Sequence, residues 1–384
     1  MPKAFNINSD ISLARTLPSS FYRSQTTFDR IKDDVFLKSW QFVGDSSQIK
    51  INNSFSPQTL LDGFLTEPIV LTRDNNSQAH CLTNVCTHRG NIVAMGSGKG
   101  KKLTCCYHGR SFELDGSFKS MPEFEKAKNF PSENDNLYSF PLEEWGPFLF
   151  AGLNPSFDFK NVLDIMNERI GFLPLNEFSF NPNLSKDYLV HCHWALYCDN
   201  YLEGFHIPFV HEGLNKVLDY GNYETKIFDY CNLQIGYSDE SNEVFDLPKG
   251  HIDEGKSIAA YYFWIYPNMM FNFYPWGLSI NVVKPLSINK TKVSFLTYVY
   301  DESKLQKGAG NDIDKVERED EFIVESVNKG IQSSFYKAGR YSPTREQGVH
   351  HFHRLLAKSL KYIFFNGIHY LSPSWAIWIR TRII

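Results

Sequence analysis

The stretch Cys86–Gly90, with the sequence CTHRG, and the stretch Cys105–Gly109, with the sequence CCYHG, decide the fold of the first part of the chain. The first stretch contains one thiol and one imidazole, the second contains two adjacent thiols and one imidazole, and sixteen residues separate His88 from Cys105. Thiolate and imidazole ligands together suit zinc or an iron–sulfur cluster. The glycine that ends each stretch permits a tight turn, which brings backbone amides close to the bound group. We therefore expect two neighbouring loops that share one metal centre.

The spacing C-x-H followed by C-x-x-H-G is typical of a Rieske [2Fe–2S] centre, in which one iron takes two cysteines and the other takes two histidines. A structural zinc site is the alternative that the same residue types allow. The predicted ligands of the cluster are Cys86, His88, Cys105 and His108.

Composition narrows the class of protein. The chain has 384 residues, which predicts two or three domains. Its net charge is -4 and it has no long basic run, which argues against a nucleic-acid partner. Seven cysteines, an odd number, are not the disulfide framework of a small secreted protein. The N-terminus lacks the apolar run of a secretory signal, and no apolar stretch is long enough to span a membrane. We therefore expect a cytoplasmic location.

The pattern along the chain predicts an α+β fold. Residues 1–39 have helical patterning and are expected to pack on a later domain as an N-terminal lead-in. Residues 40–158 contain short alternating runs between Gly, Asn, Asp and Pro clusters, as in a small all-β domain. Residues 159–360 mix helix and strand patterns in a larger catalytic domain. Within it, residues 261–283 are rich in aromatic and β-branched side chains and predict strands of an antiparallel sheet.

A second candidate site lies in the sequence NYLEGFHIPFVH, which begins at Asn200. Asn200, Glu203 and His206 recur at steps of three, so a helix places them along one face. His211 follows His206 by five residues, which is roughly 140° further round an ideal helix. Both histidines can meet one metal only if the helix is distorted, and Pro208 predicts a break between them.

A carboxylate further along the chain completes this candidate site. Residues 312–329 predict a helix whose apolar face includes Asp320. A buried carboxylate is costly unless it is paired, hydrogen-bonded or bound to metal. The alternative is a helix that turns Asp320 to solvent beside Glu319 and Glu321. Because the two histidines need a third hard ligand, Asp320 is the predicted partner.

Over nearly its whole length, the sequence resembles the α subunits of Rieske non-haem iron oxygenases, in particular the branch that contains choline monooxygenase and related enzymes of quaternary amines. The resemblance is carried by the two cluster stretches, by Asn200–His211, and by a late segment that runs from Gly339 to His353. It implies a catalytic domain of the helix-grip type, with an antiparallel sheet covered by helices.

Rieske proteins of respiratory chains add a disulfide at positions where this chain has Asn91 and Tyr107. The resemblance is therefore to the oxygenase-associated type. Cys106, beside a predicted ligand, departs from the usual non-cysteine residue and is expected to be buried and inert.

The resemblance implies a mononuclear Fe(II) that binds O₂ and is held by two histidines and a carboxylate: His206, His211 and Asp320. Glu203 is implied to bridge His206 and the cluster ligand His108 of a neighbouring subunit, which implies a homotrimer. Most ring-hydroxylating members have Asp at this position, and Glu is shared with the quaternary-amine branch. Asn200 is expected to hydrogen-bond near the iron.

The implied function is a terminal oxygenase that hydroxylates or demethylates a small organic substrate, with a quaternary amine such as choline or a betaine as the leading candidate. Electrons are expected from NAD(P)H through a separate flavin and iron–sulfur reductase, because no G-x-G-x-x-G motif follows a strand in this chain. The alternatives are a dioxygenase α subunit that dihydroxylates aromatic rings, and a Rieske electron carrier without catalysis.

Aromatic side chains are candidates for the substrate pocket, because a quaternary ammonium gains roughly 0.5–2 kcal/mol per ring by cation–π attraction. The alternative is that these rings only pack the sheet. The candidate walls are Tyr261, Trp264, Tyr266, Tyr274 and Trp276.

Residues 361–384 form an apolar and aromatic tail with Trp375, Trp378 and two arginines. Interruptions such as Asn366 and Gly367 argue against a membrane span. Contact with a membrane surface, packing on a partner subunit and a frame-shifted chain end are all compatible with this composition.

Overall fold

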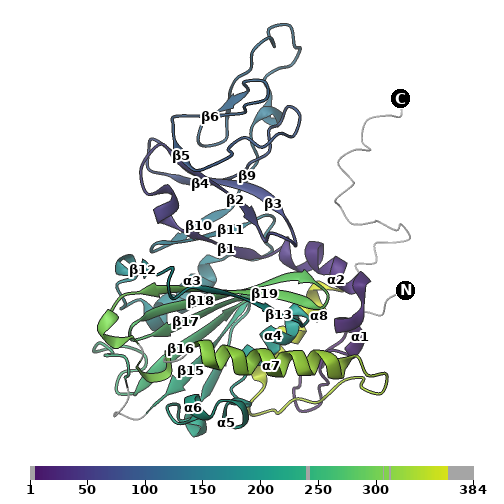
Figure 1. The fold of residues 1–384 in the computed structure, drawn as a ribbon, viewed down its shortest axis with the longest axis vertical. Helices are drawn as coiled ribbons and strands as arrows, with labels where there is room; N and C mark the ends of the chain where they lie inside the picture. Colours follow the sequence, from purple (N-terminus) through teal and green to yellow (C-terminus); the bar gives the residue numbers. More distant parts are fainter. Residues whose placement is uncertain (1–4, 239–242, 306, 311–312, 362–384) are drawn as a thin grey trace.

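Figure 1 shows a small all-β part above a larger part that is built on one antiparallel sheet. The computed structural model describes residues 5–238, 243–305, 307–310 and 313–361. Helices cover the larger sheet, whereas the small part consists of short strands and loops. The predicted α+β class, with a small all-β unit and a larger antiparallel sheet covered by helices, is confirmed.

Three sheets make up the small part, with strand orders β1-β11-β10, β5-β2-β3-β4-β9 and β6-β7-β8. Their bounds are β1 Trp40–Asp45, β2 Ser54–Leu60, β3 Glu67–Arg73, β4 Ala79–Thr83, β5 Gly98–Lys99, β6 Leu103–Thr104, β7 Ser111–Phe112, β8 Phe118–Ser120, β9 Ser139–Phe140, β10 Leu142–Trp145 and β11 Phe148–Gly152. Ile69, Val70 and Leu71 of β3 are fully buried, because β3 is the central strand of its sheet. The two cluster stretches directly follow β4 and β6, so this framework fixes where they meet.

The larger sheet has eight antiparallel strands in the order β12-β19-β18-β17-β16-β15-β14, and β13 also pairs with β19. Their bounds are β12 Ser179–Phe180, β13 Lys186–Val190, β14 Glu224–Ile227, β15 Cys231–Tyr237, β16 Ile258–Ile265, β17 Met269–Tyr274, β18 Gly277–Ser287 and β19 Lys290–Val299. Every residue of β16 and β17 is buried, because both faces of the sheet are covered. The strands predicted for residues 261–283 are confirmed.

Helices lie on both faces of this sheet. Their bounds are α1 Ser19–Arg23, α2 Gln25–Ile31, a π-helical turn Lys32–Phe36, α3 Lys160–Ile170, α4 Trp194–Tyr201, α5 Ile207–Val210, α6 Glu212–Asn215, α7 Ile313–Ile331 and α8 Gln347–Ser359. Short 3₁₀ turns span Ser46–Ile49, Glu133–Asp135, Leu175–Glu177, Tyr220–Asn222, Glu302–Lys304 and Gly308–Gly310. The core that contains α3 includes Phe271 and Phe273, and the core that contains α4 and α8 includes Trp264 and Met270. Since side chains alternate along a strand, these are opposite faces of the sheet.

The N-terminal segment packs on the helices of the larger part. The hydroxyl of Tyr22 donates to Asp199 Oδ2 at 2.9 Å, and His353 Nε2 lies 2.8 Å from Asp199 Oδ1. The backbone amide of Leu17 lies 3.3 Å from the other ring nitrogen of His353. One buried network therefore joins α1, α4 and α8 directly beside Asn200.

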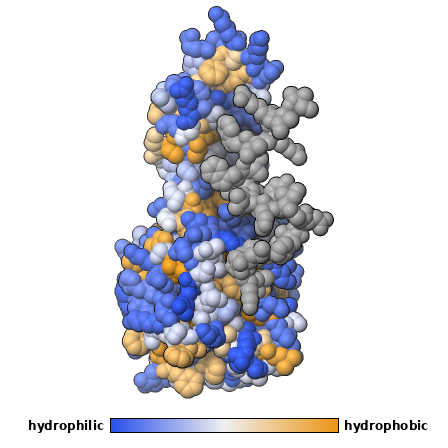
Figure 2. Space-filling model, turned by 90° about the vertical axis from the view of Figure 1, so that its right-hand side faces the viewer, coloured by the Kyte–Doolittle hydropathy of each residue, from blue (hydrophilic) through white to orange (hydrophobic). Residues whose placement is uncertain are grey.

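Figure 2 shows a surface on which apolar residues form small groups among polar ones, as is usual for a protein exposed to water. Within the described residues, the structure has no helix with the length and apolar character needed to cross a bilayer. Three roles were considered for the apolar tail. Its residues 362–384 lie outside the described part of the chain.

Candidate metal centres and active-site pocket

The two cluster stretches meet in the small part, in loops that follow β4 and β6. The imidazole rings of His88 and His108 have centroids 4.7 Å apart, at 69° to each other. The thiols of Cys86 and Cys105 are in hydrogen-bond contact and are almost fully buried. The structure therefore brings all four predicted cluster ligands together.

Glycine closes both loops for the expected reason. Gly90 has φ +70° and Gly109 has φ +75°, the left-handed region that side chains disfavour. The amide of Gly90 donates to the carbonyl of Cys86 at 2.9 Å, and that of Gly109 donates to the carbonyl of Cys105 at 3.1 Å. Each turn thereby folds the backbone tightly round its cysteine.

The donor set fits a metal–sulfur group. Burial raises the pKa of the Cys105 thiol, but hydrogen bonds from the Tyr107 amide and from Asn91 outweigh it, so the net pKa is lowered toward the ligating thiolate. The buried Nδ1 of His88 has no hydrogen-bond partner, which is costly unless a metal binds there. The expectation that Cys106 is buried is wrong: this residue is exposed, whereas the neighbouring Cys105 is buried.

The predicted helix through Asn200, Glu203 and His206 is wrong, and so is the predicted place of the break. Helix α4 ends at Tyr201, and a turn follows in which the carboxylate of Glu203 accepts the backbone amides of Phe205 and His206. Pro208 does not break a helix. It lies in the first turn of α5, where its missing N–H costs nothing. The break comes earlier, at Glu203, and the chain bends again at His211 between α5 and α6.

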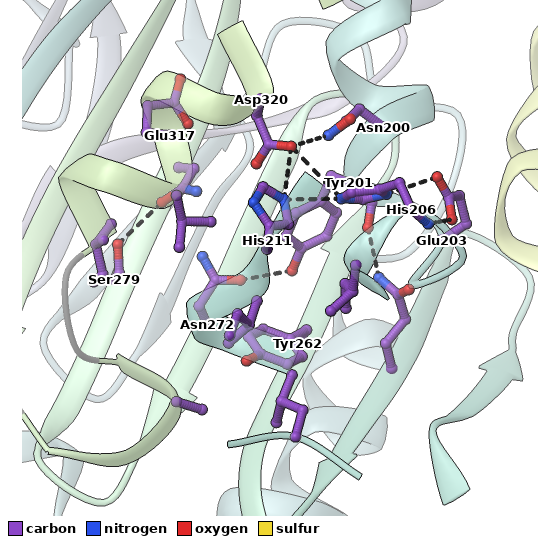
Figure 3. Close-up of a pocket in the computed structure, with 18 of the residues that line it drawn as sticks. Asn200, Tyr201, Glu203, His206, His211, Tyr262, Asn272, Ser279, Glu317 and Asp320 are labelled. Atoms are coloured by element: carbon purple, nitrogen blue, oxygen red, sulfur yellow. Dashed lines mark hydrogen bonds and ion pairs between the residues drawn. The ribbon is translucent and has the colours of Figure 1, made fainter. Parts of the chain in front are cut away.

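These bends bring three predicted ligands together, as Figure 3 shows. His206 Nε2 lies 3.2 Å from His211 Nε2, and Asp320 Oδ1 lies 3.1 Å from His211 Nε2 and 3.5 Å from His206 Nε2. Two ligands at about 2.1 Å from one ion and at right angles to each other lie about 3 Å apart, so this spacing fits a metal with three ligands on one side. The alternative in which Asp320 turns to solvent does not hold, because its side chain is only 17% exposed.

A carboxylate supports each histidine from behind. His206 Nδ1 lies 2.7 Å from Glu203 Oε1, and His211 Nδ1 lies 2.8 Å from Glu319 Oε2. These contacts leave both Nε2 atoms directed at the candidate ion, because each Nδ1 then carries the proton. The amide of Asn200 donates to Asp320 Oδ1 at 2.5 Å, as expected of a residue near the iron. Sequence reasoning missed Glu319, since nothing in the pattern separates it from a solvent-facing glutamate.

Electrostatics at this point favour a positive charge. Burial lowers the pKa of the His211 ring, but contacts with Asp320 and Glu319 outweigh it and raise the pKa above its ordinary value. The same carboxylates that attract a proton attract a divalent cation, and ligating carboxylates paired with imidazoles suit iron. The residues present therefore fit a mononuclear metal.

Glu319→Gln is expected to weaken the mononuclear metal site without emptying it. An amide at this position cannot hold the His211 ring as firmly as a carboxylate, and such supporting contacts are commonly worth about 10–100-fold in metal affinity or activity. Iron retention during dialysis against a graded chelator measures the effect. An iron affinity equal to that of the unsubstituted protein would show that the contact is incidental.

A cavity of about 120 Å³ opens beside the three candidate ligands. One water needs about 10–15 Å³ of such space, so the cavity has room for a small organic molecule. Five tyrosines lie in its wall, together with three carboxylates, and no Lys or Arg is among the described lining residues. The tyrosines are Tyr197, Tyr201, Tyr223, Tyr262 and Tyr274.

Of the five predicted aromatic walls, only Tyr274 lines the cavity. Tyr261 lies on the opposite face of β16, where it packs in the core with α3. Trp264 shares the face of Tyr262 but packs on Phe352 of α8, with ring centroids 5.1 Å apart. Tyr266 belongs to that same α8 core, and Trp276 stacks behind Tyr274 at 5.2 Å.

Two family models match this chain. Residues 39–131 match the Rieske [2Fe-2S] domain, and residues 179–361 match the ring hydroxylating alpha subunit (catalytic domain). The matched ranges contain the four cluster residues and the His206, His211 and Asp320 group, respectively.

Curated relatives and solved structures agree with these matches. The chloroplastic choline monooxygenase of Arabidopsis thaliana is 33% identical over 91% of this chain and 83% of its own length. The carnitine monooxygenase oxygenase subunit of Escherichia coli (strain K12) is 30% identical over 91% of this chain and 94% of its own. The structure of a quaternary ammonium Rieske monooxygenase superposes with a TM-score of 0.74 at 25% identity, covering 94% of this chain and all of that one.

Proposed function

Since this chain belongs to the family of Rieske non-haem iron oxygenase α subunits, we propose that it oxidises a quaternary ammonium compound such as choline, carnitine or a betaine. The predicted enzyme class, an oxidoreductase of the Rieske oxygenase type, is confirmed, as are the family's cofactors, a [2Fe–2S] cluster and mononuclear iron. The observation that supports the substrate class is the pocket wall of tyrosines and carboxylates without Lys or Arg among its described residues.

The wall suits a cation that carries methyl groups. The rings of Tyr262 and Tyr274 meet edge to face, with centroids 5.9 Å apart at 79°, and so form a corner of the cavity. Each ring that a quaternary ammonium touches contributes roughly 0.5–2 kcal/mol. An uncharged aromatic substrate would gain nothing from the carboxylates, which weighs against ring dihydroxylation.

The proposed metal ligands are Cys86, His88, Cys105 and His108 for the cluster, and His206, His211 and Asp320 for the iron. When bound, the cluster supplies electrons one at a time and the iron activates O₂ for attack on the substrate. The protein residues position these groups. Glu203 and Glu319 fix the two imidazoles, and Asn200 holds the carboxylate of Asp320.

The path of electrons argues for an assembly of subunits. Figure 1 places β6, which leads into a cluster loop, at one end of the molecule and α5 and α6 at the other, with the large sheet between them. Electron transfer falls steeply with distance, so a neighbouring subunit is the better donor. Exposed Phe209 and Phe322 flank Glu319 in a surface groove beside the iron site and offer an apolar contact for that neighbour. We therefore propose a homotrimer in which Glu203 contacts the neighbour's cluster domain.

An oxygenase subunit needs a reductase, and we propose a flavin and iron–sulfur protein that takes electrons from NAD(P)H. The exposed ring of Tyr107 lies tilted against His108, with centroids 3.7 Å apart, and belongs to the surface that Glu203 of the neighbouring subunit is proposed to contact. We also propose domain boundaries at residues 39, 158 and 360 and a cytoplasmic location.

A substrate panel tests the function. With a surrogate reductase and NADH, one of choline, carnitine, glycine betaine or γ-butyrobetaine is expected to drive oxygen uptake matched by oxidised product. Simple aromatics are expected to give only uncoupled uptake. Product from an aromatic substrate, with none from any quaternary amine, would replace the proposed function with ring dihydroxylation.

A further inference from the structure

One carboxyl group in the pocket wall has no role at the metal site. Glu317 lies on α7 one helical turn before Asp320, as Figure 3 shows, and is only 2% exposed. The hydroxyl of Tyr197 donates to its Oε2 at 2.5 Å. Its other oxygen, Oε1, is buried and has no hydrogen-bond partner. This buried carboxyl in a ligand pocket therefore has a hydrogen-bond partner for only one of its two oxygens.

The surrounding charges make this arrangement unusual. The other two acids of the wall are engaged, since Asp320 contacts both candidate iron ligands and Glu203 supports His206. Arg318, the neighbour of Glu317 on α7, pairs instead with Glu321 at 2.8 Å. A buried carboxylate without a cation is strongly unfavourable, so a position of this kind invites a positive ligand.

We propose that Glu317 is the counter-ion of the substrate's ammonium group and therefore the residue that selects cations at this site. The inference rests on the proposed function. An Fe(II) with two neutral imidazoles and one carboxylate keeps a net charge of about +1, which repels an ammonium held next to it. The Glu317 carboxylate cancels that repulsion from a position one helical turn away. The tyrosine rings then contact the methyl groups.

A consequence for pH follows from the same burial. Burial raises the pKa of Glu317 well above its ordinary value, although the hydrogen bond from Tyr197 opposes this. The charged or titratable groups that act on or near Glu317 are Tyr188, Cys192, Tyr197, Arg318, Asp320 and Glu321. Burial therefore favours the protonated form of the free carboxyl, and a bound ammonium favours the ionised form. Because the cation binds the ionised form, choline affinity rises with pH until free Glu317 is ionised.

Calorimetric titration of the anaerobic holoenzyme with two probes tests the proposal. Choline carries the charge, and 3,3-dimethylbutan-1-ol has the same shape with carbon in place of nitrogen. The unsubstituted enzyme is expected to prefer choline by roughly a hundredfold, as for a buried charge pair. Glu317→Gln should lose that preference and bind the neutral alcohol about as before, whereas Glu317→Asp should keep most of it. Glu325→Gln, on the same helix but outside the pocket wall and not among the groups that act on Glu317, is the matched control.

The outcomes separate this inference from the proposed function. If the unsubstituted enzyme prefers choline and Glu317→Gln keeps the preference, the counter-ion role is overturned and the proposed function stands. If the unsubstituted enzyme binds choline no better than the alcohol and turns over no quaternary amine, the proposed function falls first. The cluster spectrum and iron content report whether each variant has folded. Should Glu317→Gln not fold, a choline affinity that is flat between about pH 6 and pH 9 in the unsubstituted enzyme would overturn the inference.

Discussion

Asp320→Ala is expected to lose the mononuclear iron and turnover together, while the Rieske cluster stays in place. Its Oδ1 lies 3.1 Å and 3.5 Å from the two histidine Nε2 atoms, so alanine leaves only two of the three donors. The measurement is the iron content per chain, which should fall from about three to about two, with labile sulfide constant at about two. Product formation should fall at least ~10³-fold, because the step that uses O₂ has no metal.

Glu321→Ala is the matched control for Asp320→Ala. Glu321 lies next to Asp320 on α7, pairs with Arg318 and does not line the pocket. It should retain three irons per chain and near-normal turnover. A full complement of mononuclear iron in Asp320→Ala would mean that another group is the third ligand and that the proposed donor set is wrong.

Glu203→Gln is expected to keep the Rieske cluster and, once loaded with iron, to transfer electrons between the two centres much more slowly. The carboxylate contacts His206 through one oxygen and the backbone amides that follow it through the other, so it positions a ligand at the point where α4 has ended. The amide has the same shape but lacks the negative charge that would hold an imidazole from each of two subunits. In stopped-flow experiments with reduced enzyme, substrate and O₂, cluster reoxidation should slow at least about a hundredfold.

The two supporting carboxylates serve as controls for each other. Glu319 holds the other histidine, at 2.8 Å, without the proposed contact to a neighbouring cluster domain. Glu319→Gln should therefore lower iron retention while the cluster of iron-loaded enzyme still reoxidises at a comparable rate. Unchanged reoxidation in Glu203→Gln would remove the bridging role and the main chemical argument for the trimer. If both variants lost iron to the same extent, Glu203 and Glu319 would share one structural role, the support of an iron-ligating histidine.

The candidate metal ligands could be predicted because short spacing along the chain decides their geometry. Cys86 and His88 lie in one turn, and the loop after β6 supplies the matching pair, so little beyond the local pattern is needed. Asp320 could also be predicted, since a carboxylate on an apolar helix face needs a partner. The path between the two histidines was not predictable. It depends on a side chain, Glu203, that caps the turn after α4 and so ends the helix before Pro208.

By itself, the sequence determined the type of each metal centre and the general class of fold, because both follow from residue chemistry and from periods of two to four residues. Only the tertiary structure decided which side chains surround the substrate. In β16 every residue is buried, so hydrophobic alternation cannot tell the pocket side, with Tyr262, from the core side, with Tyr261. The inward positions of Glu317 and Glu319 depend likewise on how α7 lies against α4 and α5. Contacts with residues that are distant in sequence set these orientations, so the local sequence pattern cannot predict them.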